Sequence, residues 1–209
     1  MDTKPRHTAE QNNAIESYEK LLELGNSYVS QGDFFRAQQC YEKTALLEPD
    51  ESGPYVGLGV VALQNNSLDD AELAFKVAHR LDADCCRAYA GLAMVAQKKT
   101  DYETAFQMYL KCLERDTDNL TALLGLFQTS CRMGSFAKVI HYLQLYLDMH
   151  PNDTSVMFSL AALYLKEGNF EQAKKILSDI LILDPCNKDA ANLLEEIEHN
   201  AARTKRPGA

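Results

Sequence analysis

A leucine recurs every 34 residues through most of this 209-residue chain. It stands at Leu24, Leu58, Leu92, Leu126 and Leu160, with no insertion or deletion between the copies. The five frames therefore cover residues 18–51, 52–85, 86–119, 120–153 and 154–187. A fixed period of this length indicates that one small structural unit is copied along the chain, and a single unit could not bury its apolar face without neighbours.

Other positions of the frame also keep their character. Position 8 is mostly small, position 20 is Ala in all frames but one, position 24 is aromatic or Leu, and position 32 is often Pro. Each frame is broken in its middle, as at residues 31–33 and 167–169, and Leu21, Leu24 and Tyr28 lie at helical spacing before the first break. Each frame therefore predicts two helices. Gly ends the first helix in a left-handed conformation, and Asp, Ser or Asn caps the second.

This pattern resembles the tetratricopeptide repeat, a helix–turn–helix unit of the same length with the same order of large, small, aromatic and Pro positions. The resemblance covers residues 18–187 and departs from the pattern at Phe127, Ala83 and Thr117. It implies an all-α fold, a right-handed superhelical solenoid of paired helices with a concave inner surface.

A terminal helix is expected after the fifth frame. Residues 188–203 carry Leu193, Leu194 and Ile197 as a narrow apolar stripe among charges, which suits a cap on the last repeat. We therefore expect one solenoid over residues 14–203, with a first helix that begins around residues 8–13. A flexible segment is expected over residues 1–13, and a flexible basic tail over residues 204–209.

The composition argues against nucleic acid and membrane as partners. The formal net charge is −9, whereas phosphate neutralisation needs a basic face. No apolar run approaches the roughly 18 residues that would span a bilayer, and the N-terminus lacks a signal-peptide core. We expect a cytoplasmic protein without membrane insertion.

No motif for catalysis, cofactor binding or metal binding is found. The five His residues do not pair at helical spacing, and no C-x-x-C occurs. The adjacent pair Cys85 and Cys86 lies at a repeat junction, where small residues are a simpler explanation than a redox or metal site. We expect neither an enzyme nor a bound cofactor or metal.

The resemblance implies that a ligand would lie on the concave surface, which is formed by positions 2, 5, 9 and 12 of the first helices. Most of these positions are apolar here and are expected to face solvent, and exposed apolar surface usually marks a binding site. With the residues at position 6, the candidate groove consists of Leu22, Asn26, Val56, Gly57, Val60, Leu63, Arg87, Ala90, Gly91, Met94, Leu124, Gly125, Gln128, Phe158 and Ala162.

Position 6 allows two interpretations. Gly57, Gly91 and Gly125 recur at the repeat interval inside helices, where Gly costs about 1 kcal/mol relative to Ala. They could form a smooth floor that lets a ligand approach closely, or they could be needed for packing between helices.

Charged groups give two weaker signals. The carboxylate clamp of chaperone-binding members of the family is disfavoured, because among its positions only Asn26 fits, with Arg87 in a Lys position. Position 13 holds Lys98, Arg132 and Lys166 in the last three frames, a candidate basic edge. These cations could simply complement helix dipoles, or they could attract an acidic partner.

We therefore expect a non-catalytic scaffold or adaptor that binds an amphipathic helix or an apolar extended peptide of another protein. Two alternatives stay open. One is a chaperone for an export substrate, because residues 55–59 look somewhat like helices of the tetratricopeptide chaperones of type III secretion. The other is a self-assembling scaffold, a homo-oligomer in which the groove of one copy receives a terminus of the next.

Overall fold

The fifteenth residue of every repeat has a left-handed backbone, which ends the first helix of the repeat. Gly32, Gly134 and Gly168 have φ values of 76°, 72° and 78°. At the same position Asn66 and Thr100 have φ values of 59° and 62°. The chain reverses at each of these residues, so the predicted helical hairpins and their break points are confirmed. Gly and Asn adopt this conformation readily, whereas a β-branched residue such as Thr100 is strained in it.

We expect the Thr100→Gly variant to be more stable than the wild type by about 0.5–1 kcal/mol. Relief of the left-handed strain exceeds the entropy that glycine adds to the unfolded chain. Urea denaturation would measure the difference. Thr104, an exposed residue in the first turn of α6, offers the control, because the same change there lowers the helix propensity by a few tenths of a kcal/mol and removes a side-chain hydrogen bond with Asp101, so it should destabilise. If both substitutions changed the free energy of unfolding in the same direction, the backbone strain at Thr100 would be contradicted.

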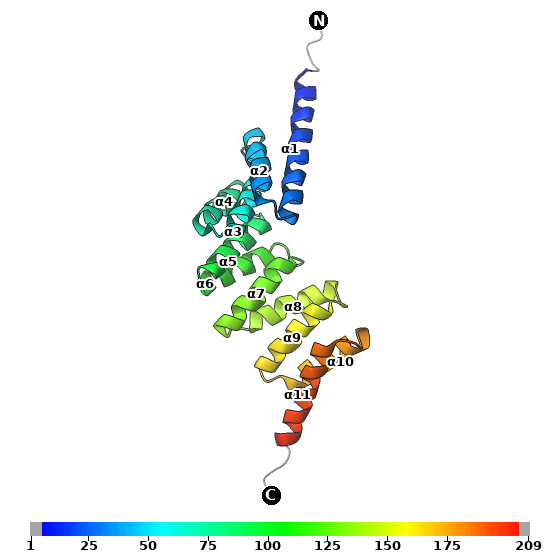
Figure 1. Ribbon diagram of the computed structural model, residues 1–209. Helices are drawn as coiled ribbons and strands as arrows, with labels where there is room; N and C mark the ends of the chain where they lie inside the picture. Colours follow the sequence, from blue (N-terminus) through cyan, green and yellow to red (C-terminus); the bar gives the residue numbers. More distant parts are fainter. Residues whose placement is uncertain (1–5, 205–209) are drawn as a thin grey trace. The chain divides into compact units, whose positions relative to one another are not determined.

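The structure, a computed structural model, describes the backbone of residues 6–204 and the side chains of residues 17–199. Within that range the helices are α1 (Arg6–Ser30), α2 (Phe34–Leu47), α3 (Ser52–Gln64), α4 (Leu68–Leu81), α5 (Cys86–Lys98), α6 (Tyr102–Leu113), α7 (Leu120–Met133), α8 (Ala137–Met149), α9 (Thr154–Lys166), α10 (Phe170–Leu183) and α11 (Lys188–Thr204) (Figure 1). No β-strand occurs among the described residues. The predicted all-α fold of tandem helical hairpins is confirmed.

The two ends differ in how they compare with the expectations. Helix α1 begins at Arg6, earlier than the start expected around residues 8–13, and the flexibility expected of residues 1–13 stays a prediction. Helix α11 corresponds to the expected terminal helix, and its Ile197 is 5% exposed. Residues 1–5 and 205–209, which were expected to be flexible, lie outside the described residues. In the part that the structure describes, no helix is long and apolar enough to cross a membrane.

The contacts of the chain group it into two compact units, and the single solenoid expected over residues 14–203 stays a prediction. Unit 1 covers residues 1–116 and holds α1–α6, and unit 2 covers residues 117–209 and holds α7–α11. Within each unit the first helix of a repeat, the A helix, packs on the second, the B helix. The B helix also packs on the next helix in the chain. Each unit is therefore a short stack of hairpins.

Two positions of the repeat build the core of both units. Position 20 is small and has no exposed surface in any repeat, at Ala37, Ala71, Ala105, Val139 and Ala173. Position 24 is large and at most 2% exposed, at Tyr41, Phe75, Tyr109, Leu143 and Leu177. The small residue lets the paired helices approach, and the large one fills the space beside them.

Candidate functional site

Positions 2, 9 and 13 form the exposed side of the A helices in unit 1. A helix turns about 100° per residue, so residues seven and eleven places after position 2 lie within about 20° of it. Helices α1 and α3 are in contact, as are α3 and α5. We call this surface the A face. Its residues, all exposed or half-buried, are Glu19, Asn26, Ser30, Gly53, Val60, Gln64, Arg87, Met94 and Lys98.

Positions 5 and 12 were expected to share this surface, and three of them do not. Val56, Leu63 and Ala90 are only 5%, 4% and 6% exposed. These positions are rotated from the stripe by about 60–80°, which turns them toward neighbouring helices. Val56 and Leu63 belong to the same core cluster as Phe75. The expectation of solvent exposure is therefore wrong for these three residues, whereas Leu22 is half-buried.

The position-6 glycine of the third repeat makes room for an aromatic ring. A Cβ on Gly91 would lie 2.3 Å from the nearest ring atom of Phe75. A Cβ on Gly59 would lie 2.7 Å from the same ring. Phe75 is 1% exposed, so its buried ring packs closely on two helix backbones that carry no side chain at the contact.

Tyr41 is held in the same way in the preceding repeat. The corresponding distances from its ring are 2.6 Å for a Cβ on Gly25 and 2.5 Å for one on Gly57. A ring, not a ligand, therefore occupies the space above Gly57 and Gly91. The ligand-floor interpretation is wrong for these two residues. Gly125 of unit 2 is also buried.

Two tyrosines at position 24 fix polar side chains on the A helices. The Tyr41 hydroxyl donates to Asn26 Oδ1 at 2.9 Å, and the Tyr109 hydroxyl donates to Gln97 Oε1 at 2.9 Å. Because the Asn26 oxygen already accepts this bond, its exposed amide NH₂ is oriented to donate to another group.

The middle of the A face is apolar. Phe75, which stands at position 24 in this repeat, has no hydroxyl group that could bind a polar side chain there. Val60 and Met94 are half-buried and pack against the core cluster that contains Phe75. The A face therefore runs from a polar α1, with Asn26, through an apolar centre at Val60 to Met94 between two cations on α5.

In unit 2 the predicted groove residues are more exposed. Leu124 is 37% exposed and Gln128 is exposed, while Phe158 and Ala162 are half-buried. The groove that was expected to run through all five repeats stays a prediction, since its residues are divided between the two units.

The three cations of the expected basic edge are exposed, each in the last turn of its helix. Lys98 lies in α5, Arg132 in α7 and Lys166 in α9. A cation at this end complements the helix dipole. Lys98 is in unit 1 and the other two are in unit 2, so a continuous edge also stays a prediction.

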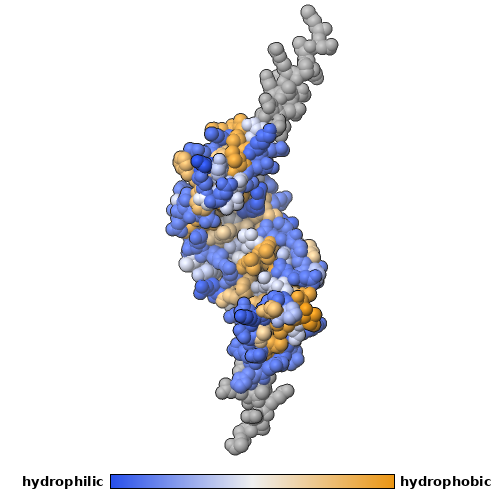
Figure 2. Space-filling model, turned by 45° about the vertical axis from the view of Figure 1, so that its right-hand side comes forward, coloured by the Kyte–Doolittle hydropathy of each residue, from blue (hydrophilic) through white to orange (hydrophobic). Residues whose placement is uncertain are grey.

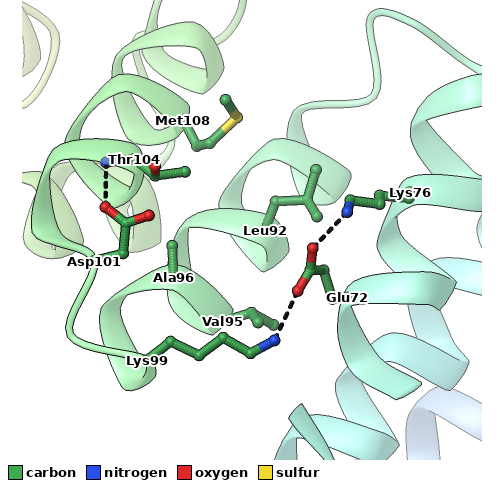
Figure 3. Close-up of a pocket in the computed structure, with 9 residues that line it drawn as sticks. All are labelled: Glu72, Lys76, Leu92, Val95, Ala96, Lys99, Asp101, Thr104 and Met108. Carbon is green, nitrogen blue, oxygen red and sulfur yellow. Dashed lines mark hydrogen bonds and ion pairs between the residues drawn. The ribbon is translucent and has the colours of Figure 1, made fainter. Parts of the chain in front are cut away.

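The B-helix side of unit 1 contains a notch of about 260 Å³ between α4, α5 and α6. Its apolar lining includes Leu92, Val95, Ala96 and Met108, with Thr104 on the α6 side (Figure 3). Sequence reasoning missed this site, because its residues come from two repeats and no single motif contains them.

Ion pairs border the notch. Lys99 Nζ lies 2.8 Å from Glu72 Oε2, and Lys76 also pairs with Glu72 (Figure 3). Lys99 Nζ also lies 2.7 Å from Asp69 Oδ1. Hydrogen bonds from Lys76 and Lys99 lower the pKa of Glu72 to about 2. The acids and lysines of this network neutralise one another and join α4 to the end of α5, and Asp101 in the lining accepts a hydrogen bond from the Thr104 backbone N–H.

The cysteines of the repeat junction are enclosed. Cys85 is 8% exposed and belongs to the core cluster, whereas Cys86 lies beside Cys112. Burial raises the pKa of Cys86, and burial with the nearby Cys86 raises the pKa of Cys112 to about 12. These thiols are therefore protonated at neutral pH. Among the described residues, no group of three or more potential ligands could hold a metal ion.

Some apolar side chains outside the A face are also exposed to solvent. Phe35 and Leu73 on the B helices of unit 1 are 71% and 65% exposed, and Ile182 of α10 is 77% exposed. Figure 2 shows apolar patches separated by hydrophilic side chains on one face of the molecule. Single exposed apolar residues are common on protein surfaces and do not by themselves mark a site.

Three family models, each described as a tetratricopeptide repeat, match residues 22–84, 87–119 and 132–197. Among curated proteins, the Protein CTR9 homolog of Arabidopsis thaliana is 25% identical over 182 residues, which are 84% of this chain and 16% of that protein. The TPR repeat-containing protein YpiA of Bacillus subtilis is 24% identical over 173 residues, 83% of this chain and 41% of that protein. The chain thus spans less than half of the length of each of these relatives.

Solved structures have the same fold. PilF of Pseudomonas aeruginosa superposes with a TM-score of 0.72 at 18% identity, covering 94% of this chain and 95% of that one. YrrB, titled a TPR protein with an unusual peptide-binding site, gives a TM-score of 0.64 at 17% identity, covering 91% of this chain and 98% of that one. The five frames in constant phase, the left-handed fifteenth residue, the family matches and the shared fold lead to one conclusion: the chain belongs to the tetratricopeptide repeat family.

Proposed function

We propose that this chain is a non-catalytic scaffold that binds an apolar or amphipathic segment of another protein on the A face of unit 1. The observation that carries the proposal is the placement of Val60 and Met94. They lie on α3 and α5, which are in contact, and keep part of their apolar surface open to solvent. Asn26 adds amide donors at the edge, oriented by the Tyr41 hydroxyl.

The expected affinity is modest. Covering the remaining surface of Val60, Met94 and the half-buried Leu22 would stabilise a complex by about 1 kcal/mol each. Ordering a flexible peptide offsets much of this gain. A scaffold that exchanges its partners needs such reversible binding.

The comparisons support this class of function without defining the partner. YrrB is described as having a peptide-binding site, and another structure of the same fold is described as an APC/C hetero-tetramer, Cut9–Hcn1. Both are protein-binding members of the fold, and we extend only that property to this chain.

The test uses peptides selected from a random phage-displayed library on the full chain. We expect the selected peptides to contain apolar residues and to bind the Val60→Glu/Met94→Glu double variant at least about tenfold more weakly than the wild type. Fluorescence anisotropy would measure the affinities. Circular dichroism and thermal melting would verify that the variant stays folded.

Leu73→Glu is the matched control, because Leu73 is an exposed apolar residue on α4, outside the A face. Its affinity for the selected peptides should equal that of the wild type. Peptides that bind the double variant as tightly as the wild type, or that lose affinity only with Leu73→Glu, would place the binding site elsewhere.

A further inference from the structure

Helix α5 presents one apolar residue between two cations along a single line. Arg87, Met94 and Lys98 are separated by seven and four residues, which places Met94 and Lys98 each within about 20° of Arg87 around the helix and about 40° from each other. Both cations are exposed and Met94 is half-buried. We call these three residues the α5 stripe.

The two cations of the α5 stripe make no ion pair within the described residues, in contrast to their neighbours. Lys99, next in the chain, binds two carboxylates, and Arg115 binds Asp84 at 3.0 Å. Arg87 and Lys98 have no carboxylate within ion-pair distance among the residues that the structure describes.

Helix electrostatics explain one cation of the α5 stripe and not the other. Lys98 lies in the last turn of α5, where a cation complements the helix dipole. Arg87 is the second residue of α5, and a cation in the first turn opposes the helix dipole. Arg87 therefore does not stabilise its own helix, and it forms no ion pair that would offset this unfavourable interaction.

The corresponding stripes of the neighbouring A helices lack this pattern. Helix α3 carries the uncharged Gly53 and Gln64 at positions 2 and 13, and α1 carries Glu19 and Ser30. Within the described part of unit 1, only α5 has a cation at each end of its stripe. The charges of Glu48, Glu51 and Arg87 all act on Tyr18, but neither carboxylate forms an ion pair with Arg87.

We propose that the α5 stripe binds an extended partner segment in which one apolar residue is flanked on the same face by acidic residues. This rests on the proposed function, and it adds the partner's charge and spacing. The apolar residue contacts Met94, and the flanking carboxylates pair with Arg87 and Lys98.

The geometry sets the spacing of the acidic residues. Arg87 lies about 10 Å along the helix from Met94, and Lys98 about 6 Å from it on the other side. An extended segment advances about 3.3 Å per residue and alternates its side chains between two faces. An acid two residues from the apolar position therefore meets Lys98. On the Arg87 side, acids two and four residues from the apolar position lie on either side of the 10 Å separation, so the long Arg87 side chain can reach one or the other.

Synthetic peptides of identical composition test this spacing. The core Glu-Ser-Glu-Ser-Leu-Ser-Glu places its acids on the same face as the leucine. The core Ser-Glu-Ser-Glu-Leu-Glu-Ser places them on the opposite face. Two further cores replace Glu in the first sequence by Lys or by Gln. Each is titrated into the full chain and followed by NMR chemical shifts at low and at physiological ionic strength.

We expect the same-face acidic peptide to bind about tenfold more tightly than the Lys peptide at low salt, and more tightly than the opposite-face peptide. Arg87→Glu/Lys98→Glu should reverse the preference between acidic and Lys peptides. The matched control is Lys43→Glu/Arg80→Glu, which changes two exposed cations on B helices and should leave the preference unchanged.

The outcomes separate this inference from the proposed function. If the four peptides bind equally, and binding is lost only in Val60→Glu/Met94→Glu, the A face binds apolar segments and the charge inference is wrong. If the two acidic peptides bind equally, the extended spacing is wrong. If none of the four peptides shifts the resonances of the A face while a phage-selected peptide does, the charge inference is wrong and the proposed function stands. If the selected peptides do not shift them either, both fail.

Discussion

Replacing Gly91 by alanine is expected to destabilise unit 1 by about 2–3 kcal/mol, although alanine is the better helix former by about 1 kcal/mol. The new methyl group would lie 2.3 Å from a ring atom of Phe75. The ring has little room to move, because it is 1% exposed and packs on Gly59 at a distance that would also exclude a Cβ there. The loss should appear as a lower urea midpoint with an unchanged m-value.

A second substitution tests the cause. Phe75→Leu removes the ring and places at position 24 the residue that repeats four and five use, Leu143 and Leu177. In this background Gly91→Ala should cost less than about 1 kcal/mol, giving a favourable coupling in a double-mutant cycle. Gly53→Ala is the control. Its Cβ would lie 3.1 Å from the hydroxyl oxygen of Tyr18, the far end of a side chain, so its effect should be small. Additive effects of Gly91→Ala and Phe75→Leu would disprove the proposed clash.

The helical hairpins could be predicted because the same turn position recurs in every repeat, which makes the turn certain where a single residue would not. A single Gly32 is only a turn signal, but the same position holds Asn66, Gly134 and Gly168, and all of them have a left-handed backbone. Aligning the five repeats would also have placed Thr100 in the left-handed conformation, although a β-branched residue disfavours it. The division into two units could not be predicted, since the period of 34 residues continues unchanged across residues 116 and 117.

The binding face could be predicted only in part. The helix and its approximate exposed side follow from the repeat, but Val56 and Leu63 show that a rotation of about 60–80° decides whether an apolar residue is surface or core. The role of Gly91 had a signal in the sequence that was not used. Where position 24 of one repeat is the aromatic Phe75, position 6 of the next repeat is Gly91. Where position 24 is Leu143, position 6 of the next repeat is Ser159. The pairing of Lys99 with Asp69 had no such signal, because it joins residues of different repeats.

Alkaline pH should destabilise unit 1 through Cys112, a thiol without exposed surface in α6. Its pKa is raised from 9.0 to about 12, mainly by burial. A raised pKa in the folded state means that the unfolded chain loses the proton first. The stabilisation is therefore complete below pH 9 and is lost as the pH rises from about 9 toward about 12. Tyr109, in the same helix, has its pKa raised from 10.0 to about 12 by burial, and it acts in the same direction.

The expected contribution of Cys112 is a loss of about 2–3 kcal/mol in the free energy of unfolding between about pH 8 and about pH 11. Urea denaturation under reducing conditions at both pH values would measure this loss. At pH 8, Cys112→Ala should be somewhat less stable than the wild type because it leaves a small cavity. Between pH 8 and pH 11, the variant should lose less free energy of unfolding than the wild type, by the same 2–3 kcal/mol to within about 1 kcal/mol. Cys186→Ala, which changes an exposed thiol of unit 2, should keep the pH dependence of the wild type. An unchanged pH dependence in Cys112→Ala would mean that the thiol ionises without unfolding the helix around it.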